Sequence, residues 1–83
     1  MNDSKILIEL HIPALNSIYN VNFPINLKVG QIVDLLNKGL YDLSDEIYVE
    51  KNNFLYDENG DKLPFNTFIH SSNLKNGSKL VLL

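Results

Sequence analysis

The stretch that decides the fold is KILIELHI, residues 5–12, in which inward and outward positions alternate. Alternation with a period of two is typical of a β-strand with one buried face. Four aliphatic side chains share the face that we expect to be buried: Ile6, Ile8, Leu10 and Ile12. The opposite face then carries Lys5, Leu7, Glu9 and His11. Leu7 is the one aliphatic residue on that outward face.

A second strand is predicted directly after the first. Residues 14–17 have the composition of a turn, and residues 19–25 alternate apolar and polar side chains again, so the two segments form a hairpin. Pro24 has no N–H to donate, which places this strand at a sheet edge or at its end. A last strand, Lys79–Leu83, follows a turn at residues 76–77.

Helical spacing begins at Val29. Apolar residues recur every three or four positions from there and predict one amphipathic helix over residues 29–38. Gly39 is expected to end this helix in the left-handed conformation. Gln31 is expected to reach back to the amide of Lys28, because Lys28 offers no acceptor as a capping residue.

The region after the helix predicts short strands and turns. Residues 46–50 alternate and predict a third strand, and residues 54–57 predict a short further strand after a turn at residues 52–53. Asn59 and Gly60 form a strong tight-turn signal. The loop over residues 64–72 contains three apolar residues, Phe65, Phe68 and Ile69, so we expect part of it to pack against the core.

The predicted order of elements is that of an α+β, β-grasp roll. One principal helix crosses one face of a mixed four- to five-stranded sheet, and the last strand inserts parallel to the first. Leu80 and Leu82 are then buried beside Ile6 and Ile8. Residues 1–83, with 45% hydrophobic content, suffice for one modest core, so we predict a single domain.

Composition excludes several classes of function. Seven Lys+Arg against ten Asp+Glu, a net charge of −3, cannot neutralise a row of phosphates, so nucleic acid is not an expected partner. The chain has no cysteine and therefore no disulfide, thiolate metal site or cysteine nucleophile. No run approaches the roughly 20 apolar residues of a membrane span. We expect a cytoplasmic protein without direct membrane insertion.

The ending NLKNGSKLVLL, residues 73–83, resembles the closing strand of ubiquitin-like proteins and is most similar to that of the bacterial YukD/EsaB family. Members of that family are small accessory proteins of the type VII (WXG100) secretion systems of Gram-positive bacteria. The resemblance implies a non-catalytic module that binds protein partners, with type VII secretion components as the expected partners, as a monomer or weak homodimer.

A conjugatable ubiquitin-like modifier or sulfur carrier is the alternative. Such proteins need a flexible tail that ends in Gly-Gly, whose carboxylate an activating enzyme can adenylate. This sequence stops at Leu82 and Leu83, which fall in the predicted last strand. The binding module is therefore the preferred hypothesis.

No motif predicts an enzyme, a metal site or a cofactor site. His11 and His70 lie on distant elements, and neither has a carboxylate cluster to orient it. Residues 57–61 resemble the start of a calcium loop, but the twelfth position is Phe68 where glutamate is needed, so a hairpin turn explains them better. Gly30 lacks the glycine-rich run of a phosphate loop. We predict no catalytic residue, metal or cofactor.

A protein-binding patch is predicted on the outward face of the sheet. If the first, last and third strands are neighbours, four apolar side chains lie side by side there: Leu7, Tyr48, Val81 and Leu83. A contiguous apolar patch rimmed by Glu9, Glu46 and Glu50 is typical of a binding site. The alternative is that the four are scattered surface residues or form a homodimer contact.

Overall fold

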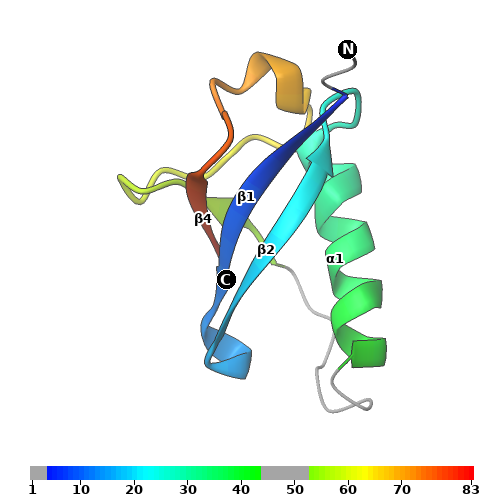
Figure 1. Cartoon of the computed structure of the whole chain (residues 1–83), viewed down its shortest axis with the longest axis vertical. Coiled ribbons are helices and arrows are strands. Elements are labelled where there is room, and N and C mark those ends of the chain that lie inside the picture. Colours follow the sequence, from blue (N-terminus) through cyan, green and yellow to red (C-terminus); the bar gives the residue numbers. More distant parts are fainter. Residues whose placement is uncertain (1–3, 44–52) are drawn as a thin grey trace.

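A computed structural model describes residues 4–43 and 53–83 of the chain. Within these residues, one four-stranded sheet carries a single α-helix on one of its faces (Figure 1). In chain order the elements are β1 (Lys5–Ile12), η1 (Pro13–Leu15), β2 (Ser17–Pro24), α1 (Val29–Leu43), β3 (Leu55–Tyr56), η2 (Ile69–Ser71) and β4 (Ser78–Leu82).

The sheet is mixed, and its strand order is β2-β1-β4-β3. β1 pairs antiparallel with β2 and parallel with β4, while β3 pairs antiparallel with β4. The first and last strands therefore lie together at the centre, as the sequence predicts. The predicted β-grasp architecture is confirmed, and so is the placement of the strand that ends at Pro24 on a sheet edge.

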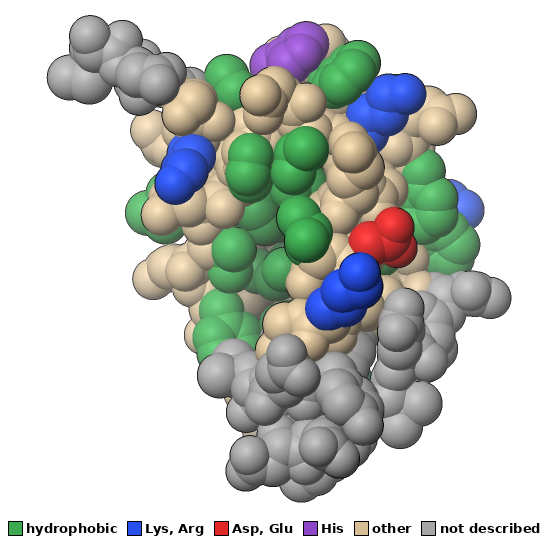
Figure 2. Space-filling view, turned by 90° about the vertical axis from the view of Figure 1, so that its right-hand side faces the viewer, with side chains coloured by type: hydrophobic (Ala, Val, Ile, Leu, Met, Phe, Trp, Pro, Cys, Tyr) green, Lys and Arg blue, Asp and Glu red, His purple; other side chains and the backbone are tan. Residues whose placement is uncertain are grey.

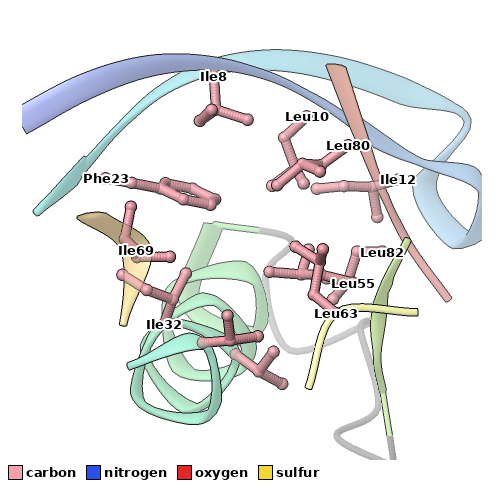
Figure 3. Close-up of a cluster of buried hydrophobic side chains, with 12 residues drawn as sticks. Ile8, Leu10, Ile12, Phe23, Ile32, Leu55, Leu63, Ile69, Leu80 and Leu82 are labelled. Atoms are coloured by element: carbon pink, nitrogen blue, oxygen red, sulfur yellow. The ribbon is translucent and has the colours of Figure 1, made fainter. Parts of the chain in front are cut away.

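The core lies between the sheet and α1 (Figure 3). Ile8, Leu10 and Leu80 are fully buried, as the alternation predicts, whereas Ile6 is only partly buried at the end of the sheet. The helix contributes Val29, Ile32 and Val33 to it, whereas Leu35 is exposed. The buried apolar residues are Ile8, Leu10, Ile12, Phe23, Val29, Ile32, Val33, Leu55, Leu63, Ile69, Leu80 and Leu82.

The start of α1 is held by the loop that precedes η2. The amide N–H of Val29 donates to the carbonyl oxygen of Thr67 at 2.9 Å, and that of Gly30 donates to the carbonyl oxygen of Phe65 at 3.0 Å. The side chain of Gln31 accepts the amide N–H of Lys28 at 2.9 Å, which confirms the predicted reach. A Cβ on Gly30 would lie 3.3 Å from Cβ of Phe65, so close packing explains this glycine.

Part of this loop packs against the core, as predicted, because Ile69 is buried, whereas Phe65 and Phe68 are exposed. One expectation for α1 is wrong. The helix does not end at Gly39 but continues to Leu43, and Gly39 has no positive φ. The sequence repeats leucine at helical spacing beyond Gly39, a signal that outweighs the roughly 1 kcal/mol cost of an internal glycine.

Two asparagines are buried at positions where the sequence predicts solvent-exposed side chains. The side-chain amide of Asn53 donates to Oδ1 of Asn37 at 2.6 Å, and both residues are buried. This hydrogen bond joins α1 to the segment that leads into β3. Asn37 falls between apolar positions of the helix and Asn53 in a predicted turn, so neither position indicates a buried pair.

The segment around β3 is described only in part. The strand predicted over Glu46–Glu50 lies outside the described residues. After β3, Oδ1 of Asp57 accepts the amide N–H groups of Asn59 at 2.9 Å and Asp61 at 3.0 Å. Gly60 has a φ of 83° there. The prediction of a tight turn over residues 57–61 is confirmed.

Gly39→Ala is expected to raise the free energy of unfolding by about 0.5–1 kcal/mol, because alanine loses less conformational entropy in a helix. No described atom lies within 4 Å of the added Cβ. Urea denaturation measures the change. Gly60→Ala is the control and is expected to lower stability, because its φ of 83° strains any other residue.

Asn37→Ala is expected to lower the free energy of unfolding by about 1–3 kcal/mol, because it removes a buried hydrogen bond from the amide of Asn53. Asn53→Ala should cost a similar amount. Since the two side chains share one bond, the double variant should lose less than the sum of the single variants in urea denaturation. Additive losses would contradict the coupling.

Candidate functional site: the open face of the sheet

The face of the sheet opposite α1 is the candidate functional site (Figure 1). Hydrogen-bonded register brings one residue of each strand into line across it. His11 of β1 lies opposite Ile18 of β2 and beside Val81 of β4, and Val81 lies opposite Tyr56 of β3. Neighbouring residues of this kind have Cβ atoms about 4.5–5.5 Å apart. We call Ile18, His11, Val81 and Tyr56 the Val81 row.

Three members of the predicted patch reach this face. Leu7 and Leu83 are exposed, and Val81 is half-buried in the Val81 row. Leu83 lies two residues after Val81 and therefore projects from the same side. Its backbone exchanges two hydrogen bonds with Phe54, of 2.7 and 3.0 Å. Tyr48 lies outside the described residues.

The expectation that these residues lie side by side is wrong for Leu7. The amide N–H of Gly77 donates to the carbonyl oxygen of Leu7 at 2.8 Å, and His11 pairs with Val81. Leu7 therefore lies four residues from the level of Val81, roughly 13 Å along the strands. The pair formed by Glu9 and Lys79 lies between them. Alternation predicts which face a residue occupies but not the offset between two strands.

Ile18 and Tyr56 are members of the face that the sequence analysis missed. Ile18 is 61% exposed, more than any other large hydrophobic residue in the described part of the chain. The sequence did contain a signal: Tyr19, Val21 and Phe23 alternate on the inward face of β2, so Ile18, one position before them, must lie on the outward face. Tyr56 was within a predicted strand, but its neighbour Val81 follows only from the register.

A shallow hollow adjoins the Ile18 end of the row. It has a volume of about 310 Å³ and is lined by residues of the hairpin end: His11, Ile12, Pro13, Asn16, Ser17 and Ile18. The lining is mainly apolar, with one imidazole. Such a hollow beside an exposed isoleucine can accept an apolar side chain of a protein partner.

The polar groups of the face form one close pair. Nε2 of His11 and Oε2 of Glu9 lie 2.7 Å apart, which orients the imidazole along β1. His70 lies elsewhere, where its ring stacks on Phe68 at 5.1 Å between centroids. Within residues 4–43 and 53–83, no three His, Cys, Asp or Glu side chains are grouped so that they could hold a metal ion. Over the same residues, no helix is long and apolar enough to cross a membrane.

Comparison with solved structures identifies the fold. The N-terminal ubiquitin-like domain in the 4931431F19Rik protein matches with a TM-score of 0.74 at 15% identity, covering 99% of this chain and 76% of that one. The chain has the ubiquitin-like fold. A scan against protein-family models and a search of the curated proteins give no match.

Two further structural neighbours come from ESX secretion systems. The EccD5 ubiquitin-like domain from Mycobacterium xenopi has a TM-score of 0.70 at 14% identity, covering 95% of this chain and 92% of that one. A chain of the MycP5-free ESX-5 inner membrane complex has a TM-score of 0.71 at 15% identity. The match covers 96% of this chain but 21% of that one. At these identities the similarity is one of fold.

Ile18→Thr and Ile8→Thr test the assignment of the two faces with the same chemical change. Ile18 is 61% exposed and Ile8 is 0% exposed. We expect Ile18→Thr to change the free energy of unfolding by less than about 0.5 kcal/mol, and Ile8→Thr to lower it by about 2 kcal/mol or more. Thermal and urea denaturation measure both. Equal losses would mean that Ile18 is covered.

Proposed function

We propose that this chain is a non-catalytic protein-binding module that acts as an accessory or regulatory component of a type VII (WXG100) secretion system in the cytoplasm of a Gram-positive bacterium. The observation that carries the proposal is the Val81 row, which presents exposed Ile18, half-buried Val81 and Tyr56 on one face. Apolar and aromatic side chains with a polar rim are typical of a surface that binds protein.

The chemistry of the open face supports binding over catalysis. His11 and Glu9 form a pair, but the residues beside them in the register are Ile18, Asn20, Val81 and Lys79, none of which is a hydroxyl or thiol nucleophile. A base without a nucleophile beside it lacks a necessary part of an acyl-transfer site. The proposal accordingly includes no metal, cofactor or nucleic acid.

The type VII assignment rests on two independent similarities. The closing residues 73–83 resemble those of the YukD/EsaB family, and ubiquitin-like domains of the same fold occur in EccD5 and in the ESX-5 inner membrane complex. The proposed partners are therefore protein components of that machinery. We propose that the module acts as a monomer or weak homodimer without inserting into the membrane.

Ile18→Asp and Val81→Asp, made together in a tagged chain, are expected to lower co-purification of type VII components from the native host by tenfold or more. Each substitution places a carboxylate where a partner buries an apolar side chain, and a central contact is worth about 2 kcal/mol. Quantitative mass spectrometry of the captured WXG100 proteins and FtsK-like ATPase measures the change.

The control is Asn66→Asp, which places a carboxylate at an exposed position of the loop before η2, outside the open face of the sheet. It should leave this co-purification unchanged. Circular dichroism and urea denaturation establish that all variants are folded at matched concentration. Unchanged capture by the double variant would reject the open face as the binding surface, and failure of the wild-type chain to capture any type VII component would reject the assignment.

A further inference from the structure

Two asparagines of the chain are followed directly by glycine, in the pairs Asn59-Gly60 and Asn76-Gly77. The backbone nitrogen of the residue after an asparagine can attack Cγ of the asparagine side chain, because the bond closes an unstrained five-membered ring. Glycine permits this attack best, since it has no Cβ to shield its nitrogen. Both glycines are exposed, and both have positive φ, 83° at Gly60 and 89° at Gly77. The local sequence and backbone conformation therefore do not distinguish the two sites.

The fold holds both reacting groups of the Asn76 site on β1. Oδ1 of Asn76 accepts the amide N–H of Leu7 at 2.7 Å. The amide N–H of Gly77 donates to the carbonyl oxygen of Leu7 at 2.8 Å. The attacking nitrogen and the attacked side chain are thus each bonded to the same residue of an interior strand. They can react only when this end of the pairing between β1 and β4 opens.

The Asn59 site is held only by bonds within its own turn. The amide N–H of Gly60 donates to the carbonyl oxygen of Asp57 at 3.0 Å, and the amide N–H of Asn59 donates to Oδ1 of Asp57 at 2.9 Å. The side chain of Asn59 forms no hydrogen bond in the described part of the chain. A fluctuation of residues 57–61 is therefore enough to free the nitrogen of Gly60.

This turn stands apart from the packed body of the molecule. Asn59 and Gly60 are exposed, and so are their neighbours Glu58 and Asp61. A Cβ added to Gly60 would have no described atom within 4 Å. Figure 1 shows the turn as a yellow-green loop that projects on the side opposite α1, whereas the apolar side chains in Figure 2 gather on the other side of the molecule. Water therefore has free access to the turn, as hydrolysis requires.

The two sites differ in how much structure must open before they react. Opening an exposed turn costs little free energy, whereas separating the strands of a core approaches the cost of global unfolding. Asn59 needs an opening of the first kind. Asn76 needs one of the second kind, because the pairing of β1 with β4 carries the buried side chains of Leu10 and Leu80.

We propose that Asn59 is a site of spontaneous deamidation in the folded chain and that the fold protects Asn76. The nitrogen of Gly60 gives up its proton and bonds to Cγ of Asn59, while the bond from Cγ to the side-chain nitrogen breaks and ammonia leaves with a proton. Water then opens the resulting succinimide ring at one of its two carbonyl carbons. Opening at Cγ leaves aspartate, and opening at the main-chain carbon leaves isoaspartate, whose backbone runs through the former side chain.

The reaction changes the border of the open face. Either product adds a carboxylate to a turn that already has three acidic residues among residues 57–61. At the base of this turn Lys62 pairs with Tyr56, a member of the Val81 row. Isoaspartate also lengthens the backbone inside the turn, where Oδ1 of Asp57 accepts two N–H groups. The inference goes beyond the function proposed above, because it assigns a covalent modification that needs no partner.

The test is incubation of the folded chain at neutral pH and physiological temperature. Peptide mapping by mass spectrometry, with L-isoaspartyl methyltransferase to detect isoaspartate, gives a rate at each site. We expect Asn59 to react tenfold or more faster than Asn76, with both aspartate and isoaspartate formed. In urea that unfolds the chain, the two rates should agree within about threefold, because the bonds that distinguish the sites are then absent.

Two variants separate local opening from unfolding. Asn59→Gln should abolish the reaction at residue 59, because the longer side chain must close a larger ring, and should leave Asn76 unchanged. Ile8→Thr removes a buried core side chain and should speed the reaction at Asn76 by tenfold or more, while the rate at Asn59 stays within twofold. Urea well below the unfolding midpoint should give the same contrast in the wild-type chain, so the comparison does not depend on one variant.

Three results would overturn the proposal. One is a rate at Asn59 in the folded chain that is no higher than the rate at Asn76. Another is equal acceleration of both sites by mild urea, which would mean that Asn59 also reacts only from the unfolded chain. The third is formation of aspartate without isoaspartate, which would mean that water hydrolyses the side-chain amide directly, without the nitrogen of Gly60.

Discussion

Parallel pairing of β1 with β4 joins segments about 70 residues apart in the chain, and the rest of the structure depends on it. It makes β1 an interior strand with β2 on one side and β4 on the other, and α1 covers its buried aliphatic side chains. Closing so long a loop costs conformational entropy. Burial of Leu80 and Leu82 in the same core as Leu10 and Ile12 offsets that cost, since each fully buried aliphatic side chain contributes about 1.5–3 kcal/mol.

The same pairing determines the chemistry of the open face. Because both strands alternate, a shift of one residue would expose the four inward aliphatic side chains of β1 or the two of β4, and would bury Glu9 or Lys79. The register is therefore specified by the core, and the outward residues follow from it. The register that places Leu80 beside Leu10 also places Val81 beside His11 and not beside Leu7.

Periodicity predicted the elements and the buried faces, and the register and the polar interior could not be predicted from it. The alternation within residues 5–12 and 79–83 predicts which side chains are buried, because each strand has one face toward the core. The offset between strands depends on packing, so the separation of Leu7 from Val81 was missed. Gly39 was predicted to end the helix because glycine favours the left-handed conformation of a helix C-cap. The apolar residues that continue the helical spacing to Leu43 outweigh that preference. Asn37 and Asn53 have polar side chains whose burial depends on a partner 16 residues away.

β2 contributes to both faces of the sheet. Tyr19, Val21 and Phe23 pack in or against the core on the side of α1, whereas Ile18 is 61% exposed on the open face. Because side chains of a strand alternate between its two faces, a substitution at Ile18 changes the open face without removing a core contact. The core and the proposed binding surface can therefore vary independently, which allows a small domain to keep its fold while its partner specificity changes.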